Sequence, residues 1–418
     1  MRLSLCWLVN GRSKSTLLLF LLKRFVIPFG VSIALVVLID IFTNGITKKL
    51  LFDSNVYIGM AEHGFAPELR ISPFIYRYAA PLLTGITHQF TDLSIYKSFK
   101  VITYLGAISE LLGVFLIVRH LTKSEKSAYI GMLSVAFSLY NLKYPLYDVY
   151  RPDILAYPII LVGTWFAFKD YFFPLLLTTM VGLQFREFVI TSLLAYLATK
   201  LQGERSKTLI RNVAISMAGL FIAIGIPRLL IPVIEHAEAV QLSPKAFGQV
   251  IQLLSLWPRN INIVYIVLAY FLPFLILYRR HQLRNALEEI PIEQVRFLAY
   301  YSGIVFLLLV MGGTDIDRFA TYFFLPLAVF TGVLAKNQSF IKLLLVLIVQ
   351  IIFNRIWLPF PVWDFDLIVN FYGGWSNVIN TASLWRFAEL IALAVIGNFL
   401  VHFQFSARQK ALSERGEG

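Results

Sequence analysis

The residues best suited to chemistry lie in a polar stretch between about 43 and 100, directly after the first long apolar segment. This stretch contains the carboxylate of Asp53 and, further along, the guanidinium group of Arg77. A positioned carboxylate can take a proton from an attacking hydroxyl group. A guanidinium group presents a planar fork of donors that suits phosphate oxygens. The pair therefore predicts proton abstraction beside a bound anion.

Two later segments carry arginines of the same kind. Glu187 follows Arg186, and Arg318 follows Asp317. Each segment interrupts a long apolar run, where an unpaired charge is costly. We predict that Arg77, Arg186 and Arg318 bind a phosphate together. For Arg186 and Glu187, an ion pair that only lets two helices turn is the simpler alternative.

The spacing of Asp53, Tyr57, Ala61 and Gly64 is helical. It predicts a helix that begins at Asp53 and packs through Tyr57 and Ala61. On spacing alone, Asp53 could equally be a helix N-cap, which contributes ~1 kcal/mol. Its place in the same loop as Arg77 favours a chemical role.

Further polar side chains occupy the same ends of the apolar segments and are predicted to line a substrate pocket. They are Tyr57, Tyr76, Arg151, Asp153, Glu187, Asp315 and Asp317. Helix capping, together with pairing between Asp148 and Arg151, is the alternative for the segment that contains Arg151 and Asp153.

The composition indicates that this protein lies in a lipid bilayer. Of the 418 residues, 58% are hydrophobic and 15% charged, and the mean hydropathy is +0.72. Soluble domains are ~45–50% apolar and ~25% charged. We predict an all-α, polytopic transmembrane bundle, with short amphipathic helices in its outer loops. The net charge of +13 then reflects basic cytoplasmic loops and not nucleic-acid binding.

About 20 helical residues cross the ~30 Å hydrocarbon core of a bilayer. The sequence contains about twelve apolar runs of suitable character, and we predict one integral membrane domain over residues 1–418. The runs lie near 25–42, 101–118, 127–147, 154–168, 171–184, 187–199, 209–233, 261–278, 297–312, 319–335, 340–358 and 384–402.

Basic residues fall in every second loop, which predicts a multi-pass protein of the plasma (inner) membrane with both termini in the cytoplasm. Residues 403–418 are then a cytoplasmic tail. The alternation holds only if the apolar stretch 171–199 is broken at residues 184–187. The loops near 43–100, 141–153, 234–260 and 359–383 then lie outside, and the working face is the outer one.

Three stretches resemble loops of the GT-C superfamily of polytopic glycosyltransferases. They are Asp53…Tyr57…Ala61…Gly64-Phe65 with Pro73-Phe74…Tyr76-Arg77…Pro81, then Arg151-Pro-Asp153 with Gln184-Phe-Arg186-Glu187, and Gly312-Gly-Thr-Asp315-Ile-Asp317-Arg318-Phe319 leading to Pro326.

The resemblance implies a polyprenyl-phosphate-linked sugar as donor and a glycan, lipid or protein as acceptor. It implies that Asp53 is the catalytic base, that the arginines grip the donor phosphate, and that the anomeric carbon is inverted. No acidic residue stands directly beside Asp53, so a divalent cation is left open and no other cofactor is predicted. The histidines lack the spacing of a zinc site.

Two other functions remain open at this stage. A transporter or flippase of lipid-linked saccharides would depend on Glu110, an acid in the middle of a span, which could also simply hydrogen-bond a neighbouring helix. An outer-face glycan polymerase or ligase would use the loop 359–383 instead of 43–100. A purely structural membrane subunit is a further alternative.

Overall fold

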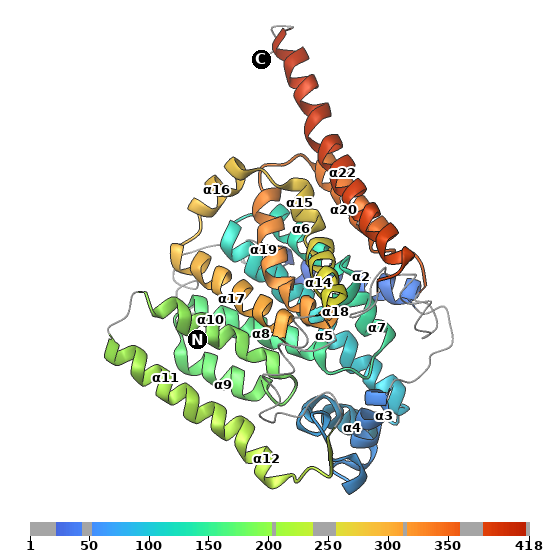
Figure 1. The fold of residues 1–418 in the computed structure, drawn as a ribbon, viewed down its shortest axis with the longest axis vertical. Coiled ribbons are helices and arrows are strands. Elements are labelled where there is room, and N and C mark those ends of the chain that lie inside the picture. The colour runs from blue at the N-terminus through green and yellow to red at the C-terminus, as the bar shows by residue number, and fades with distance from the viewer. Residues whose placement is uncertain are drawn as a thin grey trace.

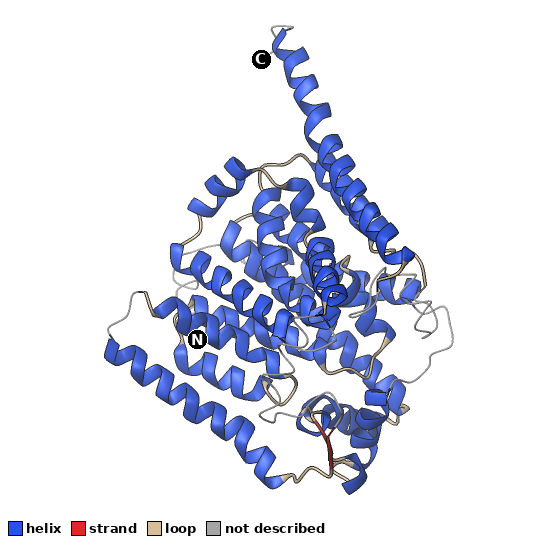
Figure 2. Cartoon of the chain, in the orientation of Figure 1, coloured by secondary structure: helices blue, strands red, loops and turns tan. Residues whose placement is uncertain are grey.

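The structure is a computed structural model that describes residues 22–43, 52–202, 206–236, 256–311, 316–359 and 379–414. Most of these residues are helical (Figures 1 and 2). Two short strands, β1 (Ile71–Ser72) and β2 (Glu235–His236), pair in parallel beside the first helices. The prediction of an all-α bundle is confirmed.

The first part of the chain contains one long central helix and several short ones. Its helices are η1 (Leu22–Val26), α2 (Ile27–Thr43), α3 (Phe52–His63), η2 (Pro67–Leu69), η3 (Phe74–Tyr76), α4 (Ala79–Thr91), α5 (Ile95–Thr122), α6 (Glu125–Ala136), η4 (Leu139–Lys143) and α7 (Tyr144–Tyr147). The predicted first outer loop, 43–100, thus contains the short helices α3 and α4.

The middle of the chain forms a layer of shorter helices. They are α8 (Asp153–Phe168), α9 (Phe172–Gly182), η5 (Glu187–Val189), α10 (Ile190–Lys200), α11 (Ser206–Leu220), η6 (Phe221–Gly225) and α12 (Ile226–Leu230). The break between α9 and α10 contains residues 184–187, so the predicted interruption of this apolar stretch is confirmed.

The last part of the chain returns to the centre of the bundle and then leaves it. Its helices are α14 (Trp257–Tyr270), α15 (Leu272–Leu277), α16 (Arg280–Glu288), α17 (Ile292–Met311), α18 (Ile316–Ala320), η8 (Thr321–Phe323), α19 (Phe324–Ala335), α20 (Phe340–Phe353) and α22 (Thr381–Glu414). Helix α22 continues through the predicted tail and projects beyond the bundle (Figure 1).

Helices that could cross a membrane are numerous. Among the described residues, six stretches are long and apolar enough, and three shorter apolar helices, α8, α9 and α20, accompany them. The stretch Ile316–Ala335 is 94% buried and lies at the centre, whereas Lys207–Leu230 is only 17% buried and lies at the edge. An apolar helix can remain exposed at the edge because lipid covers it. The chain is a polytopic helical membrane protein.

Close backbone approaches fix the central helices. A Cβ atom on Gly131 of α6 would lie 2.7 Å from the carbonyl oxygen of Ala328 in α19. One on Gly332 of α19 would lie 2.9 Å from the carbonyl oxygen of Ser127. Helices in membranes gain stability by such packing, since lipid offers no hydrophobic drive between them. The α6–α19 contact therefore holds the segment that begins with Arg318.

Candidate active site

Asp53 lies in the first turn of α3, as its helical spacing predicts. The same face of α3 buries Tyr57 and Ala61, which are 0% and 7% exposed. Ala61 packs against Gly85 of α4, where a Cβ atom would come within 2.4 Å of the Ala61 carbonyl oxygen. The expected packing of this helix is confirmed, and it fixes where the Asp53 carboxylate stands.

The Asp53 carboxylate faces two arginines from distant parts of the chain. Its Oδ2 atom lies 3.5 Å from Nη1 of Arg151 and 3.9 Å from Nη1 of Arg318. Both guanidinium groups have a closer carboxylate, which is Asp148 for Arg151 and Asp153 for Arg318. Asp53 is therefore held loosely, and its side chain is 14% exposed.

Asp153, in the first turn of α8, joins two of the predicted phosphate ligands. Nη2 of Arg318 donates to its Oδ2 at 2.9 Å, and Nε of Arg186 lies 3.1 Å from its Oδ1. The hydroxyl group of Tyr322 also donates to Oδ1 at 3.3 Å. All three charged side chains are less than 10% exposed. Asp153 thus joins Arg186, in the break between α9 and α10, to Arg318 in α18.

Glu187 extends the chain of charges to Arg77. Nε of Arg77 donates to both carboxylate oxygens of Glu187, at 3.1 and 3.2 Å, and Arg186 lies 4.0 Å from the same group. The backbone supports this link, because the amide of Ala79 donates to the Gln184 carbonyl oxygen at 3.1 Å. The four predicted residues Asp53, Arg318, Arg186 and Arg77 are therefore connected by short charge-to-charge steps. We call this set, with Arg151, Asp148, Asp153 and Glu187, the arginine–acid cluster.

Some donors in the cluster are not used. Nη1 of Arg186 is buried and has no hydrogen-bond partner within the described ranges, and Nη1 of Arg151 has only the 3.5 Å contact with Asp53. A buried donor left unsatisfied costs ~1–3 kcal/mol, and more when it is charged. Unused guanidinium donors beside a carboxylate are suited to an oxyanion ligand such as a phosphate.

The arginines outside the helical spans keep their charge. Burial alone would lower the pKa of Arg77, but Glu187 and Tyr57 outweigh it and the pKa is raised. Burial and Arg318 oppose the charge of Arg151 in the same way, yet neighbouring groups that include Asp148 raise its pKa. Opposite charges within a few ångströms favour the charged form. Arg77 and Arg151 are therefore permanent cations.

The remaining predicted pocket residues lie in different surroundings. Tyr57 is fully buried with its ring edge-on to Phe74, 5.9 Å away, and burial raises the pKa of its hydroxyl group despite Arg77 nearby. The ring of Tyr76 lies under the guanidinium group of Arg228, 5.2 Å from it.

The third predicted loop is only partly described. Asp317 is 8% exposed and acts electrostatically on Tyr144, whose ring lies 5.4 Å below the Arg151 guanidinium group. Asp315 lies outside the described residues.

Two contributors were missed by the sequence reasoning. The first is Tyr322, which donates to Asp153; it follows Arg318 by four residues, the spacing that places two side chains on one helical face. The second is Tyr144, which precedes Asp148 by four residues and supports Arg151 through its ring. Helical spacing from a charged residue to a tyrosine could have found both.

Glu110 takes part in a separate hydrogen-bond network. It is fully buried, and its Oε1 accepts from Nδ2 of Asn141 at 3.0 Å. Asn141 also donates to the carbonyl oxygen of Thr321, and the Tyr270 hydroxyl donates to that same oxygen at 3.1 Å. The Thr321 hydroxyl donates to the carbonyl oxygen of Arg318 at 2.6 Å. The network holds the η8 segment, which follows Arg318.

The cluster lies at one end of the bundle, and several basic loops lie at the other. Helix α8 begins at Asp153, and α10 begins shortly after Arg186. At the far ends of these helices, Lys200 pairs with Asp170 at 2.8 Å. Within the described ranges, no group of three or more histidine, cysteine or acidic side chains is placed to hold a metal.

Comparisons with known proteins support the fold. No protein-family model matches the sequence, and no curated protein matches it. Among solved structures, the chain is similar to the crystal structure of ArnT from Cupriavidus metallidurans bound to undecaprenyl phosphate. The TM-score is 0.54 at 11% identity, and the match covers 90% of this chain and 75% of that one. The GT-C-like fold expected from the sequence is confirmed.

Proposed function

We propose that this membrane protein is a glycosyltransferase that moves a sugar from a polyprenyl-phosphate donor to a hydroxyl group of a glycan, lipid or protein. The observation that carries the proposal is the carboxylate of Asp53, 3.5 and 3.9 Å from two buried guanidinium groups, together with a buried Arg186 donor in the same cluster that has no hydrogen-bond partner among the described residues. The structural neighbour, crystallised with undecaprenyl phosphate, supports the class of donor.

In the proposed reaction, Asp53 takes the proton of the acceptor hydroxyl group as its oxygen bonds to the anomeric carbon. The bond from that carbon to the phosphate oxygen breaks, and the phosphate leaves with the electron pair. Its charge grows from one to two negative units. Arg186, Arg318 and Arg77 stabilise that growing charge, because oriented cations in a dry site are effective where charge develops.

The proposed topology places the cluster outside. Basic loops, among them those containing Lys126 and Lys200, lie at the opposite end of the bundle from Asp153. Such loops are enriched on the cytoplasmic side of membranes. We therefore propose that the transfer takes place at the outer face and that both chain ends are cytoplasmic.

Asp53→Asn tests the proposal. Purified protein in detergent is given a panel of undecaprenyl-phosphate-linked sugars with candidate acceptors, and released undecaprenyl phosphate is measured. Loss of a general base lowers rates by about 10²–10⁴-fold. We expect that loss for Asp53→Asn, with normal membrane abundance. Full activity of this variant would contradict the assignment of Asp53 as base.

A further inference from the structure

A groove between α5 and α8 lies at the end of the bundle away from Asp53. It is a cavity of about 390 Å³, and its floor is apolar, with Gly113, Leu116, Leu161 and Val162 among its lining residues. At Gly113 the two helices approach closely, since a Cβ atom there would lie 2.8 Å from a Leu161 methyl carbon. Val162 is 47% exposed. The floor suits an acyl chain.

Cations gather where this groove ends. Arg24, Arg119 and Trp165 all line it, and Nζ of Lys169 lies 4.9 Å from the centre of the Trp165 ring. Tryptophan is enriched at the level of lipid headgroups, where its ring is apolar and its N–H is polar. The groove therefore has an apolar floor and a positively charged rim.

The rim has a cationic donor that is not used. Nη2 of Arg119 pairs with Glu125 at 3.0 Å, but Nη1 of Arg119 is buried and has no hydrogen-bond partner in the part of the chain that the structure describes. The nearby acid Asp170 already pairs with Lys200. An anionic headgroup would supply the missing acceptor.

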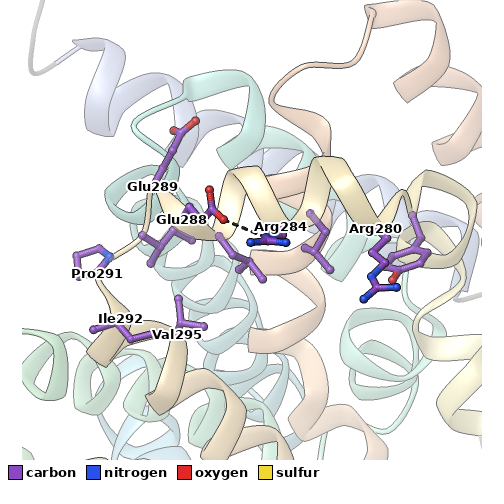
Figure 3. A pocket seen from close by; sticks show the side chains of 11 residues that line it. Arg280, Arg284, Glu288, Glu289, Pro291, Ile292 and Val295 are labelled. Carbon is purple, nitrogen blue, oxygen red and sulfur yellow. Dashed lines mark hydrogen bonds and ion pairs between the residues drawn. The ribbon is translucent and has the colours of Figure 1, made fainter.

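A second, larger cavity shows the contrast. It lies between α16 and α17, has a volume of about 770 Å³, and is drawn in Figure 3. There two acids line the cavity beside the arginines: Glu288 pairs with Arg284 at 3.1 Å, as Figure 3 shows, and Glu289 pairs with Lys336. The α16–α17 cavity therefore has acids in its lining, whereas the described lining of the α5–α8 groove contains arginines and no acid.

We infer that the α5–α8 groove binds an anionic glycerophospholipid, with an acyl chain along Gly113 and Val162 and the phosphate at Arg119 and Arg24. This is a lipid site separate from the arginine–acid cluster, and it does not depend on the proposed transfer reaction. Anionic lipids are concentrated in the cytoplasmic leaflet, which is the side predicted for this end of the bundle.

Native mass spectrometry of the full chain in detergent tests the site, with titration of phosphatidylglycerol and, separately, phosphatidylcholine. Arg119→Gln removes the rim donor, and Val162→Trp fills the floor from an exposed position. Arg284→Gln is the matched control, since it removes an exposed arginine at the α16–α17 cavity. Thermal unfolding confirms that each variant is folded.

We expect phosphatidylglycerol to bind wild-type protein more tightly than phosphatidylcholine. Arg119→Gln should weaken its binding about five-fold, the change expected for ~1 kcal/mol per basic residue at a membrane surface. Val162→Trp should abolish the binding, and Arg284→Gln should leave it unchanged.

Three results would overturn the inference. Equal binding of the two lipids would show an apolar groove without headgroup selection. An equal loss in Arg284→Gln would show attraction to general surface charge. Binding of undecaprenyl phosphate that Arg119→Gln and Val162→Trp weaken more than they weaken phosphatidylglycerol binding would assign the groove to a different lipid.

Discussion

Replacing Asp153 by asparagine should lower the stability of the protein, whereas replacing Asp53 should remove its activity and leave stability almost unchanged. The reason is that Asp153 makes short contacts with buried arginines and Asp53 makes longer ones. Asp153 is 6% exposed and contacts two buried guanidinium groups, Arg318 at 2.9 Å and Arg186 at 3.1 Å. Removing one partner of a buried ion pair costs ~3–5 kcal/mol, since the other charge stays buried and uncompensated. An asparagine can still accept from Tyr322, so we expect the lower end of that range.

A loss of ~3 kcal/mol lowers the folding equilibrium constant more than a hundred-fold. Asp53 makes longer contacts, at 3.5 and 3.9 Å, with arginines that keep closer carboxylates. Its replacement should therefore change stability by under ~1 kcal/mol while removing activity. The two variants separate a structural acid from a chemical one.

The assay is unfolding of purified protein in mixed micelles by a graded mole fraction of SDS, followed by tryptophan fluorescence. Release of undecaprenyl phosphate is measured on the same preparations. Asp153→Asn should unfold at a clearly lower SDS fraction than Asp53→Asn. Equal unfolding of Asp153→Asn and wild-type protein would show that Arg186 and Arg318 are compensated elsewhere, and the pairing argument would fail.

Two further predictions concern residues outside the cluster. Glu110→Gln keeps an acceptor for Asn141, so activity should stay within about two-fold of wild type. Loss of activity in Glu110→Gln together with full activity in Asp53→Asn would favour the transporter function instead. Gly85→Ala places a Cβ atom 2.4 Å from the Ala61 carbonyl oxygen, so α3 must move. We expect a cost of ~1–3 kcal/mol in SDS unfolding and slower transfer, whereas Gly303→Ala, with nothing within 4 Å, should change neither.

The sequence predicted those features that depend on local pattern. The helix at Asp53 follows from spacing, and the break at residues 184–187 follows from the alternation of basic loops. Apolar composition alone predicted a membrane bundle. Residues 360–378 contain most of the late loop proposed for a ligase, and they lie outside the described residues.

The pairing of charges could not be read from the sequence. Asp153 and Glu187 were predicted as pocket residues, and the structure shows them as counter-ions of Arg186, Arg318 and Arg77. These partners are separated by as many as 165 positions along the chain. Only the packing of α8 and the α9–α10 break against α18 brings them within hydrogen-bond distance. A pattern of single residues contains no information on which acid each arginine faces.

The ion pairs of the arginine–acid cluster also explain how it could hold both a catalytic base, Asp53, and the leaving phosphate. A base that shares its charge fully with a guanidinium group loses much of its affinity for a proton. Asp148 and Asp153 take the short contacts of Arg151 and Arg318, and Asp53 is left with the long ones. Nη1 of Arg186 is buried and has no hydrogen-bond partner in the described part of the chain, so it is suited to an incoming oxyanion. Under the proposed function, the acids beside Asp53 therefore keep its carboxylate out of short ion pairs while they hold the phosphate ligands in place.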